Sequence, residues 1–364
     1  PESGGASAPG TVPIELFPLD SFYPAGDEQT MVHQVTGRSV PERGLPLDMG
    51  CVVDNVGTLL NVLDALEGVP VTQKILSVVG EVGESLLFQV PVGTPLLQCV
   101  AAAGPTCARF GLIVGGPMMG KILLDQGEME AAVVTKTTGN IIVLPREHTL
   151  FQRAQLPMET IRHRTKSACI QCCMCTDLCP RHLIGHQIRP NLVMRNLWRE
   201  TDLEDNEAYL AAFGDAANCC DCGVCEMFAC PMGLSPRRVN VYLKDALRRR
   251  GIQVPRNMEP QDREFADVRR TPTDRLVARL GLSAYYGRHA HTCVQLEPEE
   301  VFLPFQQHIG KPAVPVRAVG DRVVRGNLLA QAAPDGLSAN IHASIDGVVT
   351  EITQAGTRLC RKEV

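Results

Sequence analysis

The sequence lacks an apolar run long enough to cross a bilayer, a signal peptide and any excess of basic residues. Its 364 residues include 35 Lys and Arg against 40 Asp and Glu, for a formal net charge of -5. Nucleic-acid-binding proteins concentrate positive charge on one surface, so nucleic acid is not expected as a partner. Neither a transmembrane segment nor export is indicated, and we expect a cytoplasmic location.

Cysteine, in contrast, is abundant. The chain has 15 cysteines, and eight of them form two runs in which three lie at three-residue steps and a fourth precedes a proline. Such a number in a small secreted protein would predict disulfides, whereas two runs in a longer chain fit a reducing compartment. The eight are Cys169, Cys172, Cys175, Cys179, Cys219, Cys222, Cys225 and Cys230.

The spacing of both runs is typical of iron-sulfur ligands. Three thiolates at three-residue steps surround one corner of a cube, and the fourth points to the neighbouring cube. The sequence therefore predicts two [4Fe-4S] clusters that exchange ligands, Cys230 serving the first run and Cys179 the second, although Cys225 and Cys230 stand one residue further apart than their counterparts. A zinc site and a disulfide framework are the alternatives. Cys173 and Cys220 lie off the three-residue steps and are not expected as ligands.

Residues 1–70 have an α/β pattern. Strands expected at Ile14–Leu19 and Gly50–Asp54 lead into helices at Gln29–Thr36 and Val56–Leu66. In such units loop amides and helix starts face a ligand at the carboxyl ends of the strands. An ordinary packing unit has the same pattern.

Residues 71–150 predict a small sheet with one helix, of the β-grasp kind. Strands are expected at Ile75–Val79 and Leu86–Val90. The helix is expected to be capped by Thr94 and to end before Gly104.

The cysteine region is expected to be helical. One helix would carry the apolar residues from Ile184 to Leu197 between the runs, and another would begin at Ser235 and end at Gly251. The segment after them is rich in charges and prolines, and the last part of the chain has short strands separated by hairpin turns.

Three of these stretches together resemble one family. They are the loop Tyr23–Glu28 with its partner segment near Asn55, the glycine turn at 115–120 and the two cysteine runs. They are similar to the C subunit of the Rnf-type ferredoxin:NAD oxidoreductase, and more closely to the cobalamin reductases of propanediol-utilisation microcompartments. The order of modules favours the latter, because here the module containing His308 and His342 follows the cysteine runs.

The resemblance implies an α+β multidomain protein. It comprises the remainder of an α/β flavin/NADH domain, an SLBB-like β-grasp domain, a ferredoxin-like helical domain with two clusters, a crossing segment and a lipoyl-like barrel-sandwich domain. Their expected bounds are 1–70, 71–150, 155–251, 252–300 and 301–364.

The flavin domain would be related to the flavin-bearing subunit of respiratory complex I. By resemblance, the loop beside the flavin and nicotinamide contributes Tyr23, Gly26, Asp27 and Glu28, and the positions near the flavin phosphate are Asp54, Asn55 and Thr58. Asp54 replaces the family's usual asparagine and brings a negative charge towards an anionic phosphate. The family's glycine-rich loop is absent, since Gly4-Gly5-Ala6 is not followed by Gly-Phe-Pro. We therefore expect an N-terminal truncation and little FMN binding.

The implied function of the full-length protein is that of an NADH-dependent oxidoreductase, which transfers electrons from NADH through FMN and two [4Fe-4S] clusters to a corrinoid; this sequence is not expected to have the NADH activity by itself. Flavin is required because NADH delivers a hydride and a cluster accepts single electrons. An Rnf-like or microcompartment conduit to another acceptor such as ferredoxin, and a docking scaffold with structural clusters, are the alternatives. No catalytic residue beyond the cofactors is expected.

The resemblance also implies partners and a location. The partners would be a corrinoid or its adenosyltransferase, and the shell proteins of a bacterial microcompartment that encloses the protein. The terminal module resembles lipoyl and biotinyl carriers, but Ala333–Asn340 contains no lysine. We expect neither a lipoyl nor a biotinyl group.

Overall fold

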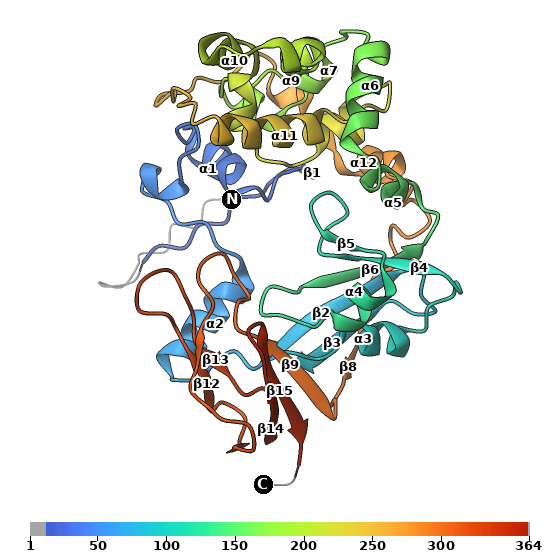
Figure 1. Cartoon of the computed structure of the whole chain (residues 1–364), viewed down its shortest axis with the longest axis vertical. Helices are drawn as coiled ribbons and strands as arrows, with labels where there is room; N and C mark the ends of the chain where they lie inside the picture. The colour runs from blue at the N-terminus through green and yellow to red at the C-terminus, as the bar shows by residue number, and fades with distance from the viewer. Residues whose placement is uncertain (1–11, 363–364) are drawn as a thin grey trace. The chain divides into compact units, whose positions relative to one another are not determined.

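The structure is a computed structural model that describes residues 12–362. Residues 1–11, which include Gly4-Gly5-Ala6, and 363–364 lie outside the described part. The chain is a mixed α/β multidomain protein that divides into two compact units (Figure 1). The first unit comprises the chain up to Val53, Arg164–Cys220 and Val224–Leu276; the second comprises Asp54–His163, Asp221–Gly223 and the chain from Val277 onward. None of the helices in the described part is both long and apolar enough to span a membrane.

The first unit begins with a short strand and a capped helix. Strand β1 (Phe22–Tyr23) pairs antiparallel with β7 (Thr271–Pro272). Helix α1 (Glu28–Thr36) follows Asp27, whose side chain accepts a hydrogen bond from the amide of Thr30. The other helices and single turns of this unit are α7 (Met174–Asp177), α8 (Pro180–Leu183), α9 (Pro190–Asn196), α10 (Asn206–Phe213), α11 (Pro236–Arg249), Pro46–Met49, Leu197–Asp202, Gly214–Asn218, Cys225–Ala229 and Asp267–Arg269. Helices α6 (Met158–Ala168) and α12 (Thr273–Arg279) contain residues of both units.

Helix α11 organises the core of the first unit. Val239, Leu243 and Leu247 form one stripe and are at most 2% exposed. The helix packs against α9 and the turn Gly214–Asn218. Burial of each such side chain contributes about 1.5–3 kcal/mol. The cysteine loops therefore run between helices that are held by a packed apolar core.

The second unit contains a six-stranded sheet with the order β5-β4-β6-β2-β3-β8. The hairpin β2–β3 is antiparallel, and β6 and β8 run parallel to β2 and β3. Leu76, Phe88 and Leu96 are among the buried residues of its core. The strands are β2 (Gln73–Gly80), β3 (Leu86–Pro91), β4 (Phe110–Val114), β5 (Lys121–Leu123), β6 (Asn140–Pro145) and β8 (Thr292–Gln295), and the helices are α2 (Val56–Leu66), α3 (Leu96–Ala103), α4 (Gln126–Ala131) and α5 (Thr149–Ala154).

The carboxyl-terminal part of the second unit consists of two small sheets around their own core. Their strand orders are β11-β14-β15-β9 and β10-β12-β13. A Cβ on Gly347 would lie 2.2 Å from the carbonyl oxygen of Cys360, so only glycine fits where β14 approaches β15. The strands are β9 (Glu300–Pro304), β10 (Val314–Pro315), β11 (Arg322–Val323), β12 (Leu328–Gln331), β13 (Ile341–His342), β14 (Gly347–Ile352) and β15 (Gly356–Arg361).

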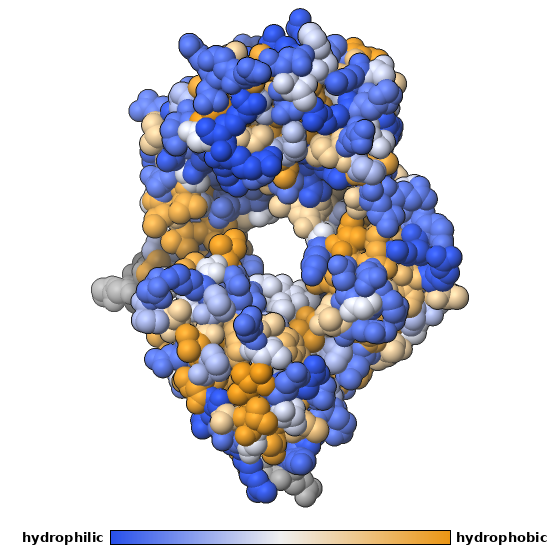
Figure 2. All heavy atoms as spheres, viewed as in Figure 1, coloured by the Kyte–Doolittle hydropathy of each residue, from blue (hydrophilic) through white to orange (hydrophobic). Residues whose placement is uncertain are grey.

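Helix α2 is unusual because it buries no residue. Its apolar side chains Val56, Leu59, Leu63 and Leu66 are 55–82% exposed. Figure 2 shows apolar side chains on the surface around this helix. A helix with so much exposed apolar surface normally packs against another element.

Several expectations from the sequence were wrong. Ile14–Leu19 and Gly50–Asp54 are not strands; within the described residues neither segment has a strand to pair with, and Ile14 is 91% exposed. The expected helix from Ile184 to Leu197 is interrupted, because Gly185 has a positive φ of 95° and Pro190 starts α9. The N-cap of α3 is Pro95, while the Thr94 hydroxyl donates to the Pro91 carbonyl.

The helices expected at Gln29–Thr36, Val56–Leu66 and Ser235–Gly251 are confirmed as α1, α2 and α11. Each has a strong local signal: a side-chain cap in the first two, and a proline at the first position of α11. The strands expected at Ile75–Val79 and Leu86–Val90 are confirmed as β2 and β3.

Candidate functional site

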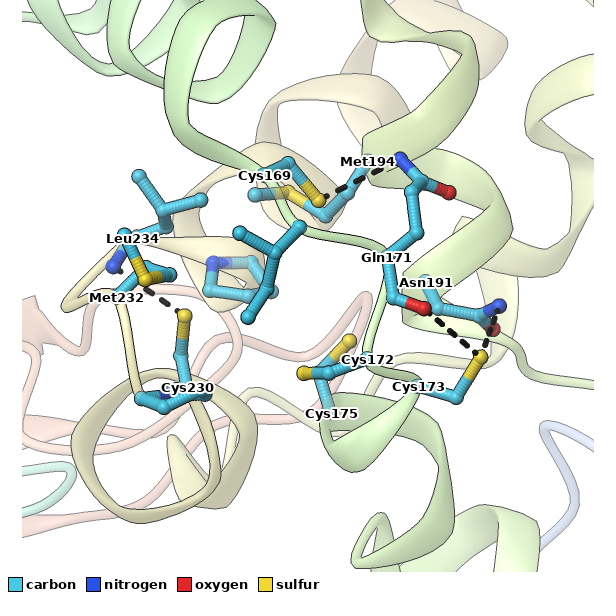
Figure 3. Close-up of a pocket in the computed structure, with 13 residues that line it drawn as sticks. Cys169, Gln171, Cys172, Cys173, Cys175, Asn191, Met194, Cys230, Met232 and Leu234 are labelled. Carbon is cyan, nitrogen blue, oxygen red and sulfur yellow. Dashed lines mark hydrogen bonds between the residues drawn. The ribbon is translucent and has the colours of Figure 1, made fainter.

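Cysteines of both runs line one pocket in the first unit. Cys169, Cys172 and Cys175 come from the first run, and Cys230 comes from the second. In Figure 3, Cys169 lies on the segment after α6, Cys172 lies in the loop before α7, Cys175 lies in α7, and Cys230 lies on the loop that leads to α11. All thirteen residues that line this pocket are uncharged.

The loops that carry the cysteines bend through left-handed residues. Gln171 and Cys173, on either side of Cys172, have φ values of 60° and 64°. In the second run Asp221 and Gly223 have φ values of 62° and 82°. Left-handed residues reverse the chain within a single residue, so a loop built this way can turn successive thiols inward.

Hydrogen bonds reach the sulfurs of this pocket (Figure 3). The Gln171 side-chain amide donates to Cys169 Sγ at 3.6 Å, and the Leu234 backbone amide donates to Cys230 Sγ at 3.4 Å. Amides that donate to ligand sulfurs stabilise their negative charge and raise the potential of a bound cluster. The pocket thus has the outer hydrogen bonds that a cluster requires.

The electrostatics of the thiols reveal two groups. Burial raises the pKa of Cys175, and the neighbouring thiolates of Cys230, Cys169 and Cys172 raise it further. Four closely spaced thiols around one pocket cannot all be anionic without a cation among them. Metal binding must therefore displace their protons.

The second group combines Cys179 with members of the second run. Burial, followed by the negative charges of the Cys220 and Cys219 thiolates, raises the pKa of Cys179 to about 12. Burial also raises the pKa of Cys225, followed by the thiolates of Cys219 and Cys179 and then by that of Cys175 in the first run. Cys230 therefore lines the pocket of the first run, and Cys179 has Cys219, Cys220 and Cys225 of the second run as charge neighbours. Cys222 is 9% exposed and belongs to the tripeptide Asp221–Gly223, which groups with the second unit.

The donors fit an iron-sulfur cube better than a single metal ion. Tetrahedral zinc would need sulfurs about 3.8 Å apart, given Zn–S bonds of about 2.3 Å. No three His, Cys, Asp or Glu among residues 12–362 are grouped to hold one ion. A cube is larger and accepts thiolates from all sides, and thiolates are its usual ligands. All 15 cysteines lie in the described part of the chain as reduced thiols, so the disulfide alternative does not apply in this structure.

Two residues that the sequence did not point to complete the first pocket. Cys173 lines it, and its sulfur accepts a hydrogen bond from the Asn191 side-chain amide at 3.3 Å. Asn191 lies in α9, 18 residues from Cys173. No local pattern marks such a residue, because its role depends on how α9 packs.

The flavin-loop residues of the first unit lie around an ion pair. Asp27 accepts two hydrogen bonds from Arg181, at 2.5 and 2.9 Å, and caps α1. Burial raises the pKa of Asp27, but the Arg181 hydrogen bond and charge, with hydrogen bonds from Thr30, lower it below its usual value. Tyr23 lies in β1, Gly26 precedes Asp27, and Glu28 is the first residue of α1. Arg181 directly follows Cys179-Pro180 and was not predicted from the sequence.

The other three flavin-site residues belong to the second unit. Asn55 caps α2 by accepting from the Thr58 amide at 2.9 Å and the Thr58 hydroxyl at 3.2 Å. Asp54 is exposed. With the Thr58 amide already occupied and no glycine-rich phosphate loop among the described residues, these three residues fit only part of an FMN site.

Comparison with known proteins shows which protein families three parts of the chain match. Residues 3–64 match the Nuo51 FMN-binding domain, residues 168–235 match the 4Fe-4S dicluster domain, and residues 286–362 match the RnfC barrel sandwich hybrid domain. The matches and the cysteine pocket therefore define a protein with an FMN-type domain and an iron-sulfur domain. The terminal module follows the cysteine runs, in the order that the sequence indicated.

The chain belongs to the cobalamin reductase PduS family. It is 42% identical over 352 residues to "Cobalamin reductase PduS" of Salmonella typhimurium, covering 96% of this chain and 75% of that protein. The protein of the same name from Citrobacter freundii is 40% identical over 350 residues, again 96% and 75% of the two chains. The C subunit of the proton-translocating ferredoxin:NAD(+) oxidoreductase complex of Clostridium ljungdahlii is 29% identical over 196 residues, 53% of this chain and 39% of its own.

Proposed function

We propose that the protein with a complete FMN-binding domain passes electrons from NADH, by way of FMN and two [4Fe-4S] clusters, to a corrinoid, and that this chain supplies the cluster part of that path. Membership of the cobalamin reductase PduS family supports the acceptor, and the matched FMN-binding and dicluster domains support the route. The observation that carries the proposal is the shared pocket, in which Cys230 of one run lies with three cysteines of the other. Such sharing fits two clusters in a single path for electrons.

The cofactors supply the redox chemistry, because FMN accepts a hydride and clusters carry single electrons. The chain would bind the clusters and shield them from solvent. We propose Cys169, Cys172, Cys175 and Cys230 as ligands of one cluster. We propose Cys219, Cys222, Cys225 and Cys179 as ligands of the other.

The proposal also includes the residues expected at the flavin site. Tyr23, Gly26, Asp27 and Glu28 would form the wall beside the flavin and nicotinamide. Asp54, Asn55 and Thr58 would lie near the phosphate. The Asp27–Arg181 ion pair would hold that wall next to the segment that carries Cys179.

We further propose the finer domain description. The bounds are those expected from the sequence: 1–70, 71–150, 155–251, 252–300 and 301–364. The β2–β3 hairpin with α3 supports an SLBB-like β-grasp domain, and the two small terminal sheets support a lipoyl-like module. A corrinoid adenosyltransferase and microcompartment shell proteins as partners, and a location inside a microcompartment, rest on the resemblance alone.

A different acceptor is the second candidate. The similarity to a component of a ferredoxin:NAD(+) oxidoreductase complex favours ferredoxin in that case. The experiment is anaerobic addition of NADH to protein with a complete FMN-binding domain, with the clusters followed by electron paramagnetic resonance. Hydroxocobalamin or ferredoxin is then added. We expect NADH to reduce the clusters and hydroxocobalamin to reoxidise them faster than ferredoxin does. Clusters that NADH never reduces would instead fit a docking scaffold.

A further inference from the structure

We propose that electrons leave the protein at the first cysteine run, through an uncharged apolar surface that receives the corrin ring of the acceptor. This exit surface is formed by Ile170, Cys172, Met174 and Met232. The inference rests on the proposed function and adds to it the place and the chemistry of the contact.

The two cysteine groups differ in their exposure. Cys172 is the one exposed thiol among the eight cysteines of the runs, all of which lie in the described part of the chain. Cys179 and Cys225 are each 7% exposed. Electron transfer without a bond between donor and acceptor weakens steeply with distance. An acceptor in solution can therefore come closest to the cluster that Cys172 would bind.

The surroundings of Cys172 are apolar and open. Ile170 is 59% exposed, Met232 is 41% exposed and Met174 is 40% exposed. Ile170 and Met232 line the same pocket as Cys172, and Figure 3 shows Met232 beside Cys230 at one side of it. Exposed apolar side chains gathered around a functional group are typical of binding surfaces. Methionine is flexible and polarisable, which suits contact with a large ring.

The absence of charged side chains from the pocket indicates which kind of acceptor fits the exit surface. None of the thirteen residues that line the pocket is charged. An acidic electron-carrier protein would be recognised by Lys and Arg, which speed its encounter at low salt. A corrin ring offers a broad apolar face edged by neutral amides. The exit surface therefore fits a corrinoid better than an acidic carrier.

The transfer step is a single reduction. Co(III) of hydroxocobalamin gains one electron from the reduced protein and becomes Co(II). Its hydroxide ligand takes a proton from solvent and leaves as water. NADH supplies the electron in the proposed function, and dithionite supplies it in the test.

The test compares Ile170→Glu with Met258→Glu. Both residues are apolar and 59% exposed, but Met258 does not line the cysteine pocket. Each protein is loaded with clusters to equal iron content and reduced with dithionite, which is then removed. Its reoxidation by hydroxocobalamin is followed by stopped flow. Binding of hydroxocobalamin to the oxidised proteins is measured separately by equilibrium dialysis.

A carboxylate on the exit surface must lose its water before the ring can make contact. We expect Ile170→Glu to lower both the second-order rate and the affinity about tenfold, and Met258→Glu to change each less than about twofold. Met232→Glu is the second variant should Ile170→Glu fail to retain its clusters.

Equal rates and affinities for Ile170→Glu and Met258→Glu would overturn the exit surface. Should hydroxocobalamin neither bind nor oxidise the parental protein, the proposed acceptor would fail, and the same variants are then tested with ferredoxin. In that case a tenfold loss in Ile170→Glu would retain the surface but refute the corrin occupant, and no loss would refute both.

Discussion

Changing Asp27 to Asn removes one charge from a buried ion pair and leaves helix α1 capped. Asn is as good an N-cap as Asp, so the Thr30 amide keeps an acceptor. The Arg181 side chain, 7% exposed, loses its bidentate carboxylate. Removing one partner of a buried pair costs about 3–5 kcal/mol. Because the Asp27 side chain is 20% exposed, we expect the free energy of unfolding to fall by the lower end of this range, about 3 kcal/mol.

The chain contains an internal reporter for this unit. Trp198 is its single tryptophan and lies in the turn Leu197–Asp202 of the first unit. Its emission is followed in urea after a constant anaerobic incubation of the cluster-loaded protein. With a slope of about 3 kcal/mol per molar urea, the apparent midpoint should fall by about 1 M.

The control is Asp245→Asn in the same unit. Asp245 pairs with Arg249 on the surface of α11, where both side chains are at least 60% exposed. Pairs of this kind contribute about 0.3–0.5 kcal/mol, so the midpoint should scarcely move. If Asp27→Asn shifted the midpoint no more than Asp245→Asn, the ion pair would not support the fold as argued.

The loss of stability caused by Asp27→Asn should become smaller as the pH falls. The pKa of Asp27 in the folded state is lower than its usual value of 3.8. Its stabilisation is therefore complete above that value and is lost as pH falls through the lower folded-state pKa. The difference between the parental protein and Asp27→Asn should stay constant from pH 7 to about pH 5 and shrink only in stronger acid.

Three further predictions concern the cofactors. Cys179→Ala should disturb the cluster of the second run, and Cys230→Ala that of the first, as resolved by electron paramagnetic resonance of the reduced proteins; loss of the same signal in both variants would refute ligand exchange. The 364-residue chain should retain little FMN after gel filtration, because it lacks the glycine-rich loop whose amides hold the phosphate; stoichiometric flavin would be the contrary result. Intact mass should show no lipoyl or biotinyl increment, since Ala333–Asn340 contains no lysine.

Local sequence signals predicted the helices well. They did not predict which segments pair or make contact in the folded protein. Val56–Leu66 was predictable because Asn55 caps it and its residues favour a helix. Gly50–Asp54 resembles a strand in composition, but a strand also needs a neighbour to bond, and composition does not reveal one. The expectation of a single helix between the runs was wrong. It followed the apolar spacing and gave too little weight to Pro190, which interrupts a helix.

At the candidate site, too, local patterns could be predicted from the sequence and tertiary contacts could not. The cysteine spacing alone predicted an iron-sulfur domain, which the match of residues 168–235 to the 4Fe-4S dicluster domain supports, while the choice of the eight ligands stays a prediction. The contacts made by Asp27, Arg181 and Asn191 could not be predicted in this way. Asp27 meets Arg181 across 154 residues, and Cys173 meets Asn191 across 18, so both contacts depend on tertiary packing.

Corrinoid reduction by Cys172→Ala and Cys222→Ala variants tests the electron path most directly. Protein with a complete FMN-binding domain is given NADH anaerobically, and flavin bleaching and corrinoid reduction are recorded in the same sample. The account predicts that flavin reduction persists in both variants while corrinoid reduction is abolished, because each change removes one cluster ligand. Corrinoid reduction at the parental rate in either variant would show that electrons leave directly from the flavin and would contradict the path through the clusters.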